Sequence, residues 1–292
     1  MSVPHAPNPP ATFDAQSTAR ALQFACDTLQ IEADAILALK ERITSKTSQQ
    51  FIQAVTLLLN CKGRVVVSGI GKSGHIARKI ASTLASTGTP AFFVHAAEAS
   101  HGDLGMITAD DVLIGISYSG EAGELLGIVP TIKRMGARLI TITGNDASNL
   151  AVQADVHLNV HIDKEACPLN LAPTASTTAQ MALGDALAVA LLDARGFGTE
   201  DFARSHPGGA LGRKLLTHVN DVMRSGDEVP RVGPDASLSE IMREMSSKGL
   251  GATAVVGADG RAIGIFTDGD LRRKVETGAD LRALTAADVM HA

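Results

Sequence analysis

The sequence predicts an α/β protein with a doubly wound, five-stranded parallel sheet, followed by a smaller α+β unit. Short runs rich in Val and Ile alternate with helical patterns between residues 64 and 194, as is typical of strands buried on both faces. The first of these runs ends in a glycine-rich turn that leads directly into a helical pattern. A chain of 292 residues with 45% hydrophobic residues has enough apolar material for about two domains.

The elements can be predicted in chain order. Residues 1–12 are rich in proline and are expected to form a disordered tail. A helical stripe covers 14–43, and Thr47 and Gln50 have capping-box spacing ahead of a second helix. The strands expected in the sheet are residues 64–68, 90–94, 111–117, 137–143 and 155–160. The helices expected around them are residues 75–87, 121–135, 148–153 and 174–194.

Composition excludes several classes of partner. A net charge of −5 with 3% aromatic residues and no Trp disfavours nucleic-acid binding. No signal peptide is recognised, and no apolar run approaches the ~20 residues of a membrane span, so no membrane partner is expected. Three cysteines without a CxxC motif indicate a reducing compartment. We therefore expect a cytoplasmic protein.

The turn after the first strand has the features of a phosphate site. Its glycines let the backbone approach an anion closely, and Lys72 and Ser73 add a positive charge and a hydroxyl donor. A P-loop is excluded because its first glycine would fall at Val66. The GxGxxG spacing matches a dinucleotide fold, but the second strand runs into His95 where an acidic residue is needed. A phosphate monoester is therefore the better ligand.

Polar residues also follow the other predicted strands, at the carboxyl ends where such sheets bind ligands. Two of these stretches have alternative explanations. The serines at 117 and 119 are either phosphate donors or a serine N-cap, and the hydroxyl-rich stretch at 174–178 is either a capping cluster or a set of substrate contacts. A long loop with two prolines, at 165–173, is of the kind that often carries function. The residues that follow the second to fifth strands are His95, Glu98, His101, Asp103, Ser117, Ser119, Gly120, Glu121, Glu124, Thr143, Gly144 and Glu165.

A second unit begins near Val219. Its predicted elements are a helix at 237–248, strands at 252–256 and 262–266, and a helix that opens after Thr267. The Asp-Val-Met sequence at 221–223 returns at 288–290, 67 positions later. The chain therefore contains one such unit and the start of a repeat.

Five motifs occur together in one order: 71–75 (GKSGH), 101–105 (HGDLG), 119–121 (SGE), 164–169 (KEACPL) and 205–209 (SHPGG). This set closely resembles the arabinose-5-phosphate isomerase family, in which a sugar-isomerase (SIS) domain precedes a pair of CBS modules. The resemblance covers roughly residues 15–292 and implies a flavodoxin-like three-layer sandwich. It implies a SIS domain at 13–216, a CBS module at 217–284 and the start of a truncated second module at 285–292.

The resemblance implies an aldose–ketose isomerase that interconverts D-ribulose 5-phosphate and D-arabinose 5-phosphate for Kdo and lipopolysaccharide synthesis. By motif, the catalytic residues are Lys72, Glu124, Glu165 and His206. The implied substrate and phosphate contacts are Gly71, Ser73, Gly88, Thr89, His101, Ser117, Ser119, Gly120 and Thr177. His95 corresponds to a contact with an inhibitory zinc. Ala122 departs from related SIS domains, which often have a hydroxyl residue after Ser-Gly-Glu.

The chemistry is consistent with these residues. Moving a proton between adjacent carbons through an enediol needs a base, a donor at the carbonyl oxygen and a phosphate anchor, and it requires no cofactor. We assign Glu165 as the base, Glu124 as a positioning or proton-exchanging group, and Lys72 as the oxyanion stabiliser, although sequence does not separate these roles. His206 would open the sugar ring or shuttle a proton.

Two alternatives stay open at this point. The chain could be a non-catalytic sugar-phosphate sensor, or another isomerase such as a hexulose-phosphate isomerase. The family resemblance further implies a homotetramer with active sites shared between subunits. With one CBS module, we expect an exposed apolar sheet face that includes Val255, Ile263 and Ile265, and little response to adenosine nucleotides.

Overall fold

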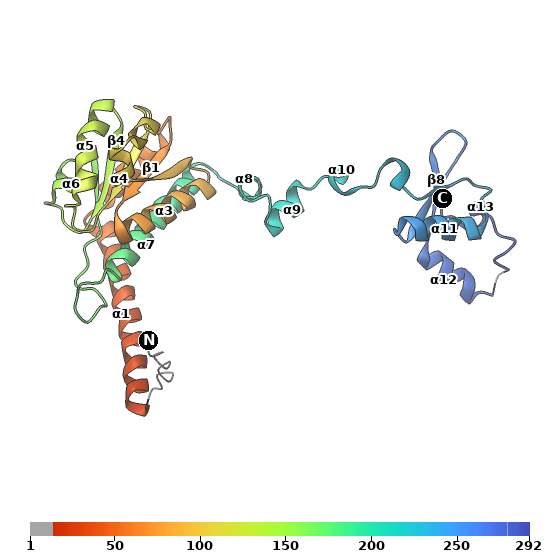
Figure 1. Cartoon of the computed structure of the whole chain (residues 1–292), viewed down its shortest axis with the longest axis horizontal. Coiled ribbons are helices and arrows are strands. Elements are labelled where there is room, and N and C mark those ends of the chain that lie inside the picture. Colours follow the sequence, from red (N-terminus) through yellow and green to blue (C-terminus); the bar gives the residue numbers. More distant parts are fainter. Residues whose placement is uncertain (1–13, 279) are drawn as a thin grey trace, which may run out of the picture. The chain divides into compact units, whose positions relative to one another are not determined.

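The structure is a computed structural model that describes residues 14–278 and 280–292. The chain divides into two compact units, Met1–Leu216 and Thr217–Ala292 (Figure 1). The tail predicted at 1–12 lies outside the described residues.

The first unit is built on a five-stranded sheet in the order β2-β1-β3-β4-β5, and every pair of neighbours is parallel. The predicted doubly wound parallel sheet is therefore confirmed. The strand order 2-1-3-4-5 is that of flavodoxin-like folds. The strands are β1 (Val65–Gly69), β2 (Ala91–His95), β3 (Val112–Ile116), β4 (Arg138–Thr143) and β5 (Val156–Asn159).

Helices cover both faces of this sheet and create two separate cores. One face packs against α1 (Ala15–Ser45), α2 (Ser48–Leu59), α3 (Gly71–Ser86) and α7 (Ala175–Ala194). The other packs against α4 (Ala96–Ser100), α5 (Gly123–Met135) and α6 (Asn149–Val152). Shorter elements are a 3₁₀ turn (Asp103–Met106), α8 (Thr199–Ser205) and α9 (Ala210–Leu216).

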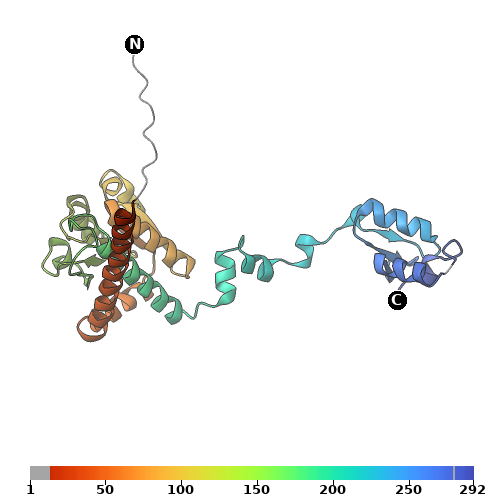
Figure 2. The same ribbon diagram turned by 90° about the horizontal axis from the view of Figure 1, so that it is seen from below.

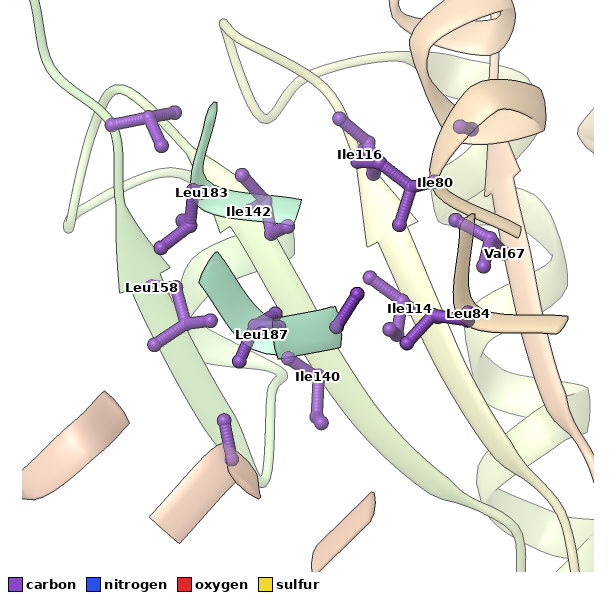
Figure 3. Packing of buried hydrophobic residues seen from close by; sticks show 14 of the residues in the cluster. Val67, Ile80, Leu84, Ile114, Ile116, Ile140, Ile142, Leu158, Leu183 and Leu187 are labelled. Carbon is purple, nitrogen blue, oxygen red and sulfur yellow. The ribbon is translucent and has the colours of Figure 1, made fainter. Parts of the chain in front are cut away.

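The alternation of side chains along each strand explains why one run of β-branched residues serves both cores. Val65 and Val67 belong to the core under α3 and α7, whereas Val66 belongs to the core under α5. Figure 3 shows Val67 near Ile80 of α3, and Leu187 of α7 facing the isoleucines of β4. Every residue of β1 and β3 is buried, as expected for central strands covered on both faces.

Two expectations about helices are wrong. The predicted capping box of α2 does not form, because Thr47 makes no cap bond and its hydroxyl instead donates to the Arg42 carbonyl at 3.3 Å. By length and composition α7 could cross a membrane, contrary to the expectation that no apolar run approaches that length. Half of the residues in the most apolar stretch of α7 are buried, and α7 packs against α3 and α1, as the core helix of an α/β domain does.

The second unit has a three-stranded sheet in the order β6-β7-β8, with the apolar faces of α11 and α13 buried against it. The strands are β6 (Arg231–Val232), β7 (Ala252–Val256) and β8 (Ala262–Thr267). The helices are α10 (Val219–Val222), a 3₁₀ turn (Gly226–Glu228), α11 (Leu238–Lys248), α12 (Asp268–Glu276) and α13 (Ala286–Val289).

The exposed face expected on this second sheet is only partly present. Ile263 and Ile265 are exposed, but Val255 is fully buried. Val255 pairs with Gly264 in the antiparallel register, so it lies on the opposite face from Ile265, which pairs with Ala254. The repeat at 285–292 packs within this unit, since Ala286 and Val289 join the core formed by α11 and β8.

Candidate active site

The glycine-rich turn leads directly into α3, which begins at Gly71 and not at 75 as predicted. A Cβ on Gly69 would lie 2.9 Å from the Ile116 carbonyl oxygen, and one on Gly74 would lie 2.8 Å from the Gly69 carbonyl oxygen. Both positions therefore need glycine for close packing. The sharp entry into α3 puts Lys72 and Ser73 in its first turn, where no side chain caps the helix. The free N–H groups and the helix dipole there favour an anion.

This helix start lies at the switch point of the sheet. Chain order reverses at β1, which pairs with β2 on one side and β3 on the other, and Gly69 is in register with both His95 and Ile116. Open parallel sheets bind ligands in the crevice at such a point. The segments that follow β1, β2 and β3 therefore converge around the first turn of α3.

The segment after β3 turns tightly through its serines. Ser117 Oγ accepts from Gly120 N at 3.2 Å, and Ser119 Oγ accepts from Glu121 N at 3.2 Å. The N-cap of α5 is Ala122, so the alternative of a serine N-cap is wrong. Gly120 has φ +70°, and a Cβ there would lie 2.1 Å from Ser148 Oγ. This backbone places Glu124, which is exposed, in the first turn of α5.

Glu165 lies beside this same segment. A cavity of about 230 Å³ is lined by Tyr118, Asn170 and Glu165, among others. The Tyr118 hydroxyl accepts from Ile162 N at 3.3 Å and so connects the β3 segment to the chain that leads to Glu165. The Glu165 carboxylate accepts three hydrogen bonds from the start of α7, and its pKa lies below the ordinary value: burial raises it, but bonds from Ser176 and Thr174 lower it more.

The histidines after β2 are held locally. His95 Nδ1 accepts from Ala97 N at 3.3 Å, and its ring lies edge-on to Phe93 with centroids 6.3 Å apart. His101 is exposed at the end of α4. Across residues 14–278 and 280–292, no three His, Cys, Asp or Glu side chains converge as a metal site. The zinc contact of His95 stays a prediction.

Three predicted site residues do not lie with the others in this chain. Gly88 and Thr89 precede β2 and so lie at the amino-end edge of the sheet, opposite Lys72. There a Cβ on Gly88 would lie 2.3 Å from Phe197 Cδ2, and Arg195 Nε donates to Thr89 Oγ1 at 3.1 Å. His206 follows α8, which begins a few residues beyond this edge, and its ring stacks on Phe202 with centroids 4.1 Å apart.

Thr177 lies in the first turn of α7, and its hydroxyl donates to the Thr174 carbonyl at 2.8 Å. The ion pair between Lys79 and Asp185 and the close approach of Ile80 to Gly184 put α3 and α7 side by side. Both helices begin at the carboxyl-end edge, so Thr177 and Lys72 lie at the same edge. Sequence reasoning missed the parts of Thr174 and Asn170 in holding Glu165. The only signals were the hydroxyls near 174 and the long loop, because the carboxylate they serve lies up to nine positions upstream.

The geometry defines a class of protein, one in which a flavodoxin-like domain presents an anion site at its switch point. Comparison with known proteins agrees: residues 58–190 match the SIS domain and residues 219–277 match the CBS domain. An Escherichia coli CFT073 protein solved in complex with arabinose 5-phosphate aligns with a TM-score of 0.61 at 42% identity, over 67% of this chain and 100% of that one.

Full-length relatives narrow the class further. The chain is 56% identical to arabinose 5-phosphate isomerase KdsD of Pseudomonas aeruginosa over 263 residues, which is 90% of this chain and 79% of the relative. It is 52% identical to KdsD of Yersinia pestis over 280 residues, 96% of this chain and 84% of the relative. The chain belongs to the arabinose 5-phosphate isomerase family, as its motifs predicted.

Proposed function

We propose that this protein interconverts D-ribulose 5-phosphate and D-arabinose 5-phosphate through an enediol, and that the product enters Kdo synthesis. The observation that carries the proposal is the uncapped start of α3, with Lys72 and Ser73 in its first turn beside the β3 segment. This arrangement fits one terminal phosphate, because free N–H groups, a hydroxyl and a lysine charge meet there. The reaction needs no cofactor, so none is proposed.

Binding of the phosphate would position the reacting carbons between two carboxylates. Glu124 lies in the first turn of α5 and Glu165 lines a cavity together with Tyr118, so acidic groups would flank the phosphate site from separate segments. A carboxylate base and a donor at the carbonyl oxygen are what an enediol mechanism requires. Holding the sugar by its phosphate makes proton transfer at adjacent carbons effectively intramolecular.

We also propose that the complete site forms between subunits. Gly88 and Thr89 lie at the amino-end edge against the short segment that leads from α7 to α8, whereas Lys72 lies at the carboxyl-end edge of the same sheet. His206 and Lys72 can therefore act on one substrate when two copies of the chain place opposite edges together. The long α1, the red helix in Figure 2, offers surface for such assembly. Leu22, Leu29 and Leu37 are exposed along it.

The assay is direct. Purified protein is given ribulose 5-phosphate, and arabinose 5-phosphate is measured by chromatography after quenching; ribose 5-phosphate and hexulose 6-phosphate are separate trials. We expect arabinose 5-phosphate as the product and an equilibrium reached from either direction. A protein that binds sugar phosphates but converts none of them would be a sensor, which is the main alternative. Conversion of hexulose 6-phosphate alone would indicate a different isomerase.

A further inference from the structure

The loop at 164–174 folds back, so that the carboxylate of Glu165 near its beginning caps the start of α7 at its end. Glu165 Oε2 accepts from Thr174 N at 2.8 Å, from Thr174 Oγ1 at 3.0 Å and from Ser176 N at 3.2 Å. Thr174 is the N-cap position of α7, yet its own side chain makes no cap bond. Glu165 therefore satisfies the N–H of the N-cap residue and one free N–H in the first turn of a 20-residue helix, from nine and eleven positions upstream.

The hydroxyl of Thr174 is used twice. It donates to Glu165 Oε2 and accepts from Ala166 N at 2.8 Å, so both ends of the loop are tied through one oxygen. Valine has nearly the same shape as threonine but can make neither bond. Serine can make both. The two substitutions therefore separate the hydroxyl from the packing of the side chain.

Asn170 holds the backbone of the same glutamate. Its side-chain Oδ1 accepts from Glu165 N at 2.7 Å, and its own N–H donates to the Cys167 carbonyl at 2.7 Å. Asn170 has φ 53°, a left-handed conformation that asparagine tolerates better than most residues. Asn170 thus holds the main chain of Glu165, and Thr174 holds its carboxylate.

These bonds all fall on one carboxylate oxygen. In the part of the chain that the structure describes, no hydrogen bond falls on Glu165 Oε1. One oxygen therefore anchors the side chain to α7, and the other is available to a ligand in the cavity shared with Tyr118. A carboxylate held in this way already has a fixed orientation, so its side chain loses no further conformational entropy when substrate binds.

We propose that Thr174 and Asn170 are positioning residues for the isomerisation, which hold Glu165 so that its free oxygen meets the sugar. This proposal rests on the proposed function and adds to it two residues that neither accept nor donate the transferred proton. Glu165 thereby acts as a fixed, ionised group, and its loop is a rigid part of the site.

The test compares Thr174→Val with Thr174→Ser in the full chain. We expect Thr174→Val to lower kcat by about 10- to 100-fold with a smaller change in KM, because a carboxylate misplaced by about 1 Å loses alignment with the reacting carbons. Thr174→Ser should keep most of the wild-type kcat. Thr56→Val is the matched control, since that hydroxyl donates to the Ile52 carbonyl within α2, at 2.8 Å. Equal loss in Thr174→Val and Thr174→Ser, or no loss in either, would overturn the proposal.

A double-mutant cycle shows whether Thr174 acts through Glu165. Thr174→Val should slow the wild-type enzyme but should not slow the Glu165→Gln variant further. If the losses in kcat from Thr174→Val and Glu165→Gln add up in the double variant, Thr174 does not act through Glu165. For Asn170, substitution by glycine keeps the left-handed backbone and removes the acceptor, so kcat should fall about 10-fold while thermal stability changes little. Unchanged kcat in Asn170→Gly would remove Asn170 from the proposal.

A readout that does not need turnover distinguishes this proposal from the proposed function. Carbon-13 labelling of glutamate side chains allows the Glu165 carboxyl to be titrated by NMR, with Glu165→Gln giving the assignment. The pKa of Glu165 should be lower in the wild type than in Thr174→Val, because one of its donors is lost. The same pKa of Glu165 in both proteins would overturn the positioning role of Thr174. An inactive wild type that still shows the shift would refute the proposed function alone.

Discussion

Gly184 of α7 lies directly against Ile80 of α3: a Cβ on Gly184 would be 2.3 Å from both Cδ1 and Cγ1 of Ile80. Glycine inside a helix costs stability relative to alanine, about 1 kcal/mol. The glycine at 184 lets α3 and α7 approach each other closely near the middle of both helices. Since Lys72 lies in the first turn of α3 and Glu165 caps the start of α7, this contact sets the spacing of two site groups.

We therefore expect Gly184→Ala to destabilise the first unit despite the better helix propensity of alanine. Overpacking of this kind costs about 1–3 kcal/mol. Thermal unfolding measures the change. Combining Gly184→Ala with Ile80→Val should recover part of the loss, because valine lacks Cδ1, one of the two Ile80 atoms nearest to the added Cβ. A double variant less stable than the sum of the two single changes would show that the contact is not the cause.

Lys72→Ala should reduce both turnover and phosphate-dependent affinity while leaving the fold unchanged. Lys72 is exposed in the first turn of α3 and belongs to neither buried core, so its loss removes a charge and little packing. We expect kcat/KM to fall by about 100-fold or more. Inhibition by inorganic phosphate, measured beside the assay, should weaken in parallel. Normal phosphate inhibition in the variant would place the anchor elsewhere.

Mixed oligomers test whether active sites are shared. Lys72→Ala and His206→Ala proteins should each have low activity alone. After the two are unfolded together and refolded, hybrids contain some sites with neither substitution, so part of the activity returns. Differently tagged chains and two-step purification verify the hybrids. Verified hybrids without recovered activity would mean that one subunit supplies both residues.

The acid stability of the second unit should depend on Asp270. This carboxylate is buried, and burial raises its pKa, but bonds from Thr267, His291 and Arg273 lower it far below the ordinary value. Its stabilisation is therefore complete above the unfolded-state pKa of about 4 and is lost as pH falls below that value. Asp270→Asn should lower the free energy of unfolding by ~2 kcal/mol at neutral pH. Calorimetry should show this difference shrinking below pH 4; a constant difference would refute the ionic contribution.

A chain cut after Leu216 should retain most isomerase activity. The five-stranded sheet, the glycine turn, Glu165 and His206 all belong to the first compact unit. Activity per site and oligomer size, from light scattering, would be compared with the full chain, and adenosine nucleotides should shift the melting of the full chain little. Loss of activity without loss of folding would show that the second unit contributes to the site.

Local sequence patterns predicted the parallel sheet and the helices between its strands, which the structure confirms, and they also predicted an anion site at the start of α3. These features are encoded locally, because short Val- and Ile-rich runs and helical patterns identify the elements, and a glycine turn between strand and helix has few other uses. The family motifs then assigned roles to Lys72 and Glu165 from the residues alone.

Which of these residues lie together follows from the three-dimensional arrangement of the segments. It placed Gly88 and Thr89 at the edge opposite Lys72, and it made Glu165 the cap of a helix that starts ten positions later. It also buried Val255, through an antiparallel register with Gly264 that no local pattern encodes. In each case the contact joins residues of different segments through packing or hydrogen bonds, and such pairings depend on the whole fold and not on sequence periodicity.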